Sequence, residues 1–155
     1  MASRKTDKVI AHLLDGSLLK GSTHDFYPIR ASFDLKTEDG EVHRVNIGEL
    51  KALFFVKTLS GRNDYRERKG FFDKDVRGSK ILVEFFDGEV IFGYSMTYSP
   101  KGHGFFMVPG DPDSNNLKVF VVHASTKRVK VKLAAGKRAP TKKTRSKKTR
   151  VRTRR

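Results

Sequence analysis

The chain alternates short runs of strand-forming residues with turn signals, and this pattern occurs twice. Residues 8–21 read KVIAHLLDGSLLKG and residues 80–93 read KILVEFFDGEVIFG, so the two segments repeat at an offset of 72 residues. In each segment a strand meets an Asp-Gly pair, which indicates a β-hairpin because glycine readily adopts a positive φ. A second strand then runs to Gly21 or Gly93, where we expect a sharp bend or a bulge.

The repeat continues through three more strands in each copy. We expect these strands over residues 33–35, 42–47 and 51–56 in the first copy, and over residues 105–108, 118–122 and 126–131 in the second. A tight corner precedes the last strand of each copy, at residues 48–50 and 123–125. Five short strands with such a corner predict an all-β protein built from two tandem five-stranded barrels of the SH3-like or Sm-like type, since closure leaves few exposed edges.

The composition predicts how the chain is divided. We expect a flexible N-terminus over residues 1–7, barrel modules over 8–56 and 80–133, a connector over 57–79 and a disordered basic tail over 134–155. A module of about 50 residues buries too little surface to be comfortably stable alone. The two barrels should therefore pack against each other, with Phe71 and Phe72 of the connector contributing to that contact.

The positive charge is concentrated in the tail. The chain has 33 Lys and Arg against 17 Asp and Glu, for a net charge of +16. Residues 134–155 contain 11 of these cations and no acid, which leaves a net charge of only +5 for residues 1–133. The tail also has no aromatic residue, so it cannot bury enough apolar surface to offset the entropy cost of ordering.

A dense cationic segment of this kind suits a phosphate backbone, because binding releases condensed counterions. Interleaved Thr and Ser can add hydrogen bonds to phosphate oxygens. Without aromatic residues the tail cannot read bases, so we expect sequence-nonspecific binding of DNA or RNA. The candidate nucleic-acid-binding residues are Lys137, Arg138, Lys142, Lys143, Arg145, Lys147, Lys148, Arg150, Arg152, Arg154 and Arg155.

Two predicted loops offer a second contact with the same partner. Tyr27 and Arg30 follow the bent strand of the first copy, and Tyr98 and Lys101 follow that of the second. An aromatic side chain in such a loop can stack on a base, which is worth about 1–3 kcal/mol. These four residues are the candidate base-stacking or loop contacts.

The sequence carries no recognised catalytic or metal-binding motif. The sequence has no Gly-x-x-x-x-Gly-Lys-Ser/Thr loop, no His-Glu-x-x-His and no nucleophile elbow. It has no cysteine, and its five histidines are scattered singly. We therefore predict no catalytic residue, no metal site and no cofactor. The N-terminus is polar and no apolar run approaches the roughly 18 residues of a membrane span, so we expect a cytoplasmic protein. Association with the nucleoid or the ribosome stays open.

The repeated segments resemble two known groups of proteins. The order strand, Asp-Gly, strand, Gly resembles the opening of Sm-like RNA-binding barrels, and VFVVHAST at residues 119–126 is loosely similar to the closing segment of bacterial Sm-like RNA chaperones. The stretches LLDGSLLKGSTHDFYP, LKALFFVKTLSG, FFDGEVIFGY and DPDSNNLKVFVV resemble an uncharacterised bacterial family of tandem small β-barrels, sometimes labelled PilZ-like, over residues 7–133. Both resemblances imply the barrel fold, but the Sm-like and PilZ ligand motifs are not reproduced.

Other functions stay open at this stage. The barrels could form a protein–protein adaptor in which the tail is secondary, or a PilZ-like sensor of a cyclic dinucleotide, for which Arg62 and Arg66 have the spacing of the ligand-binding arm. The tail itself could act as a solubilising segment, or it could contact anionic lipid headgroups.

Overall fold

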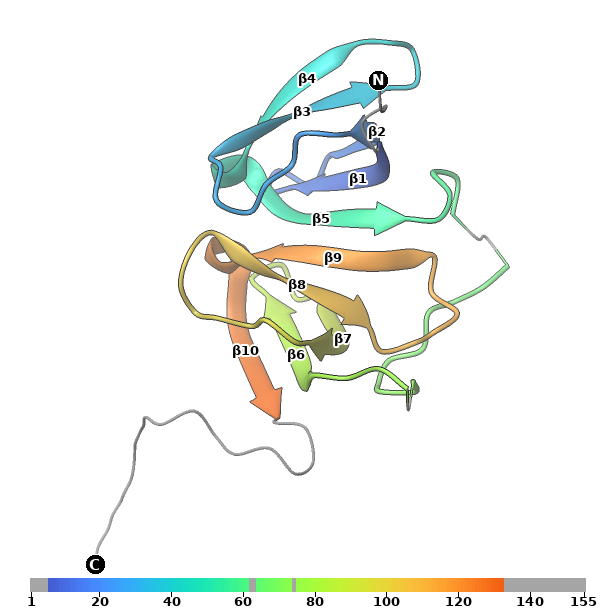
Figure 1. Ribbon diagram of the computed structural model, residues 1–155, viewed down its shortest axis with the longest axis vertical. Helices are drawn as coiled ribbons and strands as arrows, with labels where there is room; N and C mark the ends of the chain where they lie inside the picture. The colour runs from blue at the N-terminus through green and yellow to red at the C-terminus, as the bar shows by residue number, and fades with distance from the viewer. Residues whose placement is uncertain (1–5, 62–63, 74, 133–155) are drawn as a thin grey trace, which may run out of the picture.

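The structure, a computed structural model, describes residues 6–61, 64–73 and 75–132, and within them it is an all-β protein, as predicted (Figure 1). Ten strands are joined by turns, by the connector and by two short 3-10 turns, η1 (Ile47–Glu49) and η2 (His123–Ser125). The strands are β1 (Asp7–Leu13), β2 (Leu18–Thr23), β3 (Ser32–Thr37), β4 (Val42–Asn46), β5 (Leu50–Val56), β6 (Ser79–Phe85), β7 (Val90–Ser95), β8 (Gly104–Pro109), β9 (Asn116–Val122) and β10 (Thr126–Lys132).

All strand pairs are antiparallel, and the strands form one sheet in the order β10-β6-β7-β8-β9-β5-β1-β2-β3-β4. We call β1–β5 the first half and β6–β10 the second half. Each half has the same internal order, in which the last strand pairs with the first and the fourth lies at the far side. The halves join end to end where β5 pairs with β9, with Leu53 opposite Phe120. This leaves β4 and β10 as the two edges of the sheet.

Both predicted Asp-Gly hairpins are present, between β1 and β2 and between β6 and β7. Gly16 and Gly88 have φ values of 90° and 95°, the left-handed region that favours glycine. Asp15 and Asp87 contribute in another way, since each carboxylate accepts a hydrogen bond of 2.9 Å from the backbone N–H two residues later. The aspartate thus stabilises the turn as a local acceptor.

Gly21 and Gly93 mark the points where one strand passes between two neighbours. Gly21 lies opposite Val9 of β1 and Thr37 of β3, and Gly93 is placed in the same way in the second half. A Cβ atom on Gly21 would lie 2.0 Å from the carbonyl oxygen of Lys36. Glycine is needed here because the next strand's backbone approaches too closely for any side chain.

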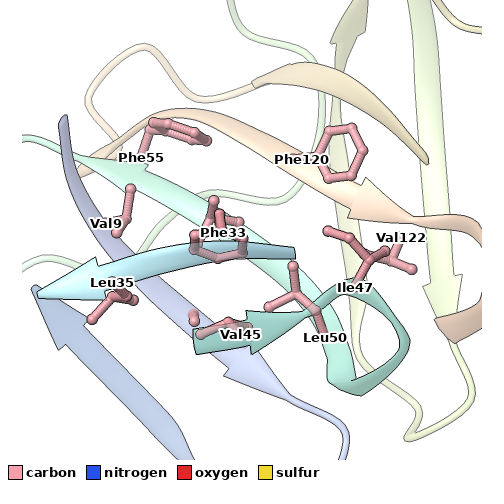
Figure 2. Packing of buried hydrophobic residues seen from close by; sticks show 11 residues of the cluster. Val9, Phe33, Leu35, Val45, Ile47, Leu50, Phe55, Phe120 and Val122 are labelled. Atoms are coloured by element: carbon pink, nitrogen blue, oxygen red, sulfur yellow. The ribbon is translucent and has the colours of Figure 1, made fainter. Parts of the chain in front are cut away.

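Two hydrophobic cores lie on opposite sides of the β5–β9 pair, and both strands contribute to both cores. Leu53, Phe55, Phe120 and Val122 belong to the core of the first half, which Figure 2 shows with Val9, Phe33, Leu35, Val45, Ile47 and Leu50. Ala52, Phe54, Val56, Val119 and Val121 belong to the core of the second half. Burial on both faces explains why these two strands are continuous apolar runs rather than alternating ones.

The contact between the halves therefore differs from the one predicted. Phe71 packs against Phe92 and Tyr94 of β7, with ring centroids 5.7 and 5.6 Å apart, and Phe72 is 45% exposed. The prediction that these two residues contribute to the contact between the modules is wrong. The β5–β9 pairing does so, because its apolar side chains already close both cores.

A buried cation adds a polar link between the halves. Lys51, at the start of β5, is almost fully buried, and its Nζ lies 2.7 Å from a carboxylate oxygen of Asp87 and also contacts Glu89. Burial alone would lower the pKa of Lys51, but hydrogen bonds from its ammonium group to Asp87 and Glu89 raise it overall. Lys51 therefore stays charged and ties β5 to the β6–β7 turn.

Asp111 fastens the connector to the loop between β8 and β9. Asp111 is 1% exposed, and its carboxylate accepts hydrogen bonds from the backbone N–H of Arg68 at 2.8 Å, from the Arg68 guanidinium at 3.0 Å and from the Tyr65 hydroxyl. Burial would raise the pKa of Asp111, but the hydrogen bonds from Arg68 and Tyr65 hold it well below its usual range. The side chain is thus a buried, charged anchor.

Candidate nucleic-acid interface

The predicted cations of the tail, from Lys137 to Arg155, lie outside the described residues, as does the predicted disorder of residues 134–155. The strand that leads into the tail is described, and it is basic itself. Four of the seven residues of β10 are cations, namely Lys127, Arg128, Lys130 and Lys132. The sequence contains no Asp or Glu after Asp113. The basic segment therefore begins inside the folded sheet, before the boundary predicted at residue 134.

Three of these cations share one face of the sheet edge. Arg128, Lys130 and Lys132 occupy alternate positions of an extended strand, so their side chains point to the same side. All three are exposed. Val129, between them, packs toward the core of the second half, so the basic face points away from that core.

The neighbouring strand adds one more cation to this face. Lys132 lies opposite Lys80 of β6, and directly opposed residues of an antiparallel pair project from the same side. The Nζ of Lys80 lies 5.4 Å from the ring centroid of Phe71. We call Lys80, Arg128, Lys130 and Lys132 the basic strip. Its one acidic neighbour in a described salt bridge is Glu84, 3.8 Å from the Nε of Arg128.

The equivalent positions in the first half are apolar and buried. Ala52 and Phe54 of β5 lie opposite His12 and Ile10 of β1. In the second half, Glu84 and Leu82 are the counterparts of His12 and Ile10 at the offset of 72. Arg128 and Lys130 of β10 lie opposite Glu84 and Leu82. From sequence the cations of β10 were missed because the boundary at residue 134 placed them in the part of the chain whose net charge is only +5. A comparison of the last strands of the two copies, at an offset of 76, would have shown the replacement.

The predicted loop residues of the first half are on the surface. Tyr27 is 49% exposed, and the guanidinium carbon of Arg30 lies 4.5 Å from the centroid of its ring. One face of the Tyr27 ring is therefore covered by a cation of the same loop. The geometry leaves an aromatic and a guanidinium group together at the surface, and either can stack on a base.

The loop of the second half differs from this prediction. Lys101 is exposed, but Tyr98 packs edge-on against Phe105, with ring centroids 4.8 Å apart, and lies on the core of the second half. Burial raises the pKa of the Tyr98 hydroxyl. Tyr98 is thus largely a packing residue rather than an open stacking platform, because its loop folds back over the sheet.

The structure brings both loops to one groove between the halves, with a volume of ≈ 540 Å³. Arg30 and Lys101 are each next in sequence to a residue that lines it. His123 stands in its wall, with its Nε2 2.8 Å from the carbonyl oxygen of Ser99. The lining residues are Ala31, Ile47, Gly48, Gly102, His103, Val122, His123 and Ala124.

The residues with PilZ-like spacing, Arg62 and Arg66, belong to the connector. Arg62 lies outside the described residues and Arg66 is exposed. Ser114 is buried and donates a hydrogen bond to Glu67 of the connector.

In the described part of the chain no group of three or more His, Asp or Glu side chains could hold a metal ion. The same residues contain no helix of the length and apolar character that a membrane span requires.

One family model matches the chain over residues 5–132, and its description is "Family of unknown function (DUF6982)". The match covers all ten strands and stops where the tail begins. Neither a curated protein nor a solved structure matches the chain.

Proposed function

The chain belongs to the family of unknown function DUF6982, and from its own residues we propose that it is a non-catalytic, sequence-nonspecific nucleic-acid-binding protein of the cytoplasm. The observation that carries the proposal is the segregation of charge. Residues 114–155 contain 16 Lys and Arg and no acid, which equals the net charge of the entire chain. A polyanion that meets this segment would find no acidic side chain within it.

In this proposal the tail supplies most of the affinity through contacts with phosphates. Lys and Arg neutralise the backbone charge, and the gain comes from released counterions rather than from base recognition. Affinity should therefore fall steeply as salt is raised and should vary little with sequence. DNA and RNA both present the required phosphates.

The sheet supplies a second, weaker contact. We propose that each half is a small barrel of the SH3-like or Sm-like type, which the shared strand order and the close approach at Gly21 and Gly93 support. The loops of the two halves then meet at the groove, which is lined by Ala31 and Gly102, the residues next in sequence to Arg30 and Lys101. An unstacked base could lie there, with the Tyr27–Arg30 pair beside it.

The proposal is tested with the full-length chain in which all eleven tail cations are replaced by Gln. Binding to a fluorescent single strand and to a duplex is measured by anisotropy over a range of salt concentrations. We expect binding to be lost at about 0.1 M salt, with a shallower dependence of log K on log salt. The matched control keeps the tail composition but shuffles its order, and it should bind like the parent. Equal binding by the Gln variant and the parent would contradict the proposal.

A further inference from the structure

We propose that the basic strip of Lys80, Arg128, Lys130 and Lys132 is a preformed phosphate-binding surface on the folded sheet, along which bound nucleic acid continues from the tail. The inference rests on the proposed function and adds a site to it. Its partner is the phosphate backbone of one strand. The strip extends the tail inward, because β10 ends at Lys132 and the first tail cation is Lys137.

The spacing of the strip fits a repeating anion. Residues of a β-strand rise about 3.3 Å each, so alternate side chains stand about 6.6 Å apart along one face. Arg128, Lys130 and Lys132 therefore form a straight row of charges on a rigid backbone. Each of these side chains can contact one phosphate of an extended nucleic-acid strand. The sheet has already fixed the backbone of these residues, so little backbone freedom is lost on binding.

The fold does not require cations at these positions. In the first half the same face of the last strand holds Ala52 and Phe54, which are buried because β9 and the second half cover them. At β10 no described strand lies beyond the edge, so any hydrophilic residue would serve there. Lysine on an edge strand commonly prevents that strand from pairing with a strand of another chain. Edge protection works with charge of either sign, however, as in the Asp34–Arg44 pair at the β4 edge, whereas phosphate binding needs positive charge.

The strip suits contact with the phosphate backbone, and the described fold has no helix to insert into a groove. The two described helical elements are three-residue 3-10 turns, so the described part of the chain has no helix that could enter the major groove. The strip lies on a sheet edge with exposed side chains. Such a surface can follow phosphates without reading base edges.

The test compares two full-length variants with the same change in charge. In the strip variant Lys80, Arg128, Lys130 and Lys132 are replaced by Gln, which keeps the edge polar. In the control variant the exposed cations Lys8, Lys20, Lys36 and Lys57 are replaced by Gln instead. Thermal melting first establishes that both variants fold like the parent, and binding to a single strand and to a duplex is then measured against salt.

We expect the strip variant to bind at least about ten-fold more weakly than the control at about 0.1 M salt, with the salt slope reduced by about 0.7 per lost phosphate contact on a single strand and about 0.9 on a duplex. Lysine footprinting of the parent should show that bound nucleic acid protects Lys80, Lys130 and Lys132 from acylation. A larger effect on one probe identifies whether single strand or duplex follows the strip.

The outcomes separate the two proposals. Loss of binding in the tail variant, together with equal binding by the strip and control variants and no lysine protection, would overturn the strip and leave the proposed function standing. A parent chain that binds neither probe would overturn both. Lysine protection at the strip in a parent whose strip variant also binds weakly supports the inference directly.

Discussion

The Nε of Arg44 lies 2.6 Å from a carboxylate oxygen of Asp34 on the neighbouring strand, at the β4 edge of the sheet. In the second half the corresponding pair is Phe120 and Phe106, whose ring centroids are 5.1 Å apart. The aromatic pair lies where the two halves join, and the ion pair lies where the sheet ends. On this face of the sheet, equivalent positions are apolar where the other half pairs beyond them and charged where the sheet ends.

The same change at both edges predicts that charge prevents the sheet from growing. The variant Asp34→Phe, Arg44→Phe, Arg128→Ala, Lys130→Phe and Lys132→Val gives β3, β4 and β10 the side chains of the internal join. We expect it to self-associate head to tail, as β5 and β9 already do within the chain. Sedimentation velocity should show larger species that increase with concentration. A variant that sediments like the parent at every concentration would contradict this explanation of the charged edges.

The two loop tyrosines should respond differently to truncation. Tyr27→Ala removes an exposed ring, so we expect single-strand binding to weaken by about 1 kcal/mol, at the lower end of the range for one stacked base, and stability to change little. Tyr98→Ala removes a ring packed on Phe105, so we expect it to lower stability by about 2 kcal/mol. Anisotropy and chemical denaturation measure the two effects. Loss of binding in a well-folded Tyr98→Ala protein would reverse the assignment.

The buried carboxylate of Asp111 should matter for stability and for its pH dependence. Asp111→Ala leaves the Arg68 backbone N–H and the Tyr65 hydroxyl without this acceptor and breaks the ion pair with the Arg68 guanidinium, so we expect a loss of about 2 kcal/mol in the free energy of unfolding. Because folding lowers the pKa of Asp111, its contribution is complete above the unfolded pKa of about 4 and is lost as the pH falls toward the folded value. Urea unfolding at a series of pH values measures both effects. The variant should lose less stability than the parent between pH values of about 5 and 2.

Substitution of Gly21 in β2 by alanine should cost far more stability than the same substitution at the exposed Gly48. Gly21→Ala places a Cβ 2.0 Å from a backbone oxygen, so the strands must separate, and we expect a loss of about 3 kcal/mol or more. Gly48 has no atom within 4 Å of an added Cβ, and Gly48→Ala should change stability by less than about 0.5 kcal/mol. Denaturant unfolding of both variants checks the difference. Equal costs would mean that β3 can move away from β2 without penalty.

Local signals in the sequence were enough to predict the strands and turns. Asp15-Gly16 and Asp87-Gly88 predicted two hairpins that the structure contains, because a positive φ at glycine and a local acceptor are properties of a few neighbouring residues. The corners before β5 and β10 were predicted from the repeat in the same way. The all-β class followed from these elements.

The pairing of β5 with β9 had no local signal that identified the partner. The runs around Phe54 and Phe120 indicate burial on both faces, but burial does not say which distant strand provides it. The connector aromatics Phe71 and Phe72 were an equally apolar alternative, and that prediction was wrong. The basic face of β10 was also missed, since Lys130 becomes unusual only when its counterpart Phe54 is known.

The sharing of β5 and β9 between the cores has a consequence for how the protein unfolds. Phe54 belongs to the first half but packs in the core of the second, and Phe120 belongs to the second half but packs in the core of the first. Unfolding of either half therefore removes buried side chains from the core of the other half. A duplicated sequence of this kind should behave as one cooperative unit whose two copies depend on each other, even though each copy has a complete set of five strands.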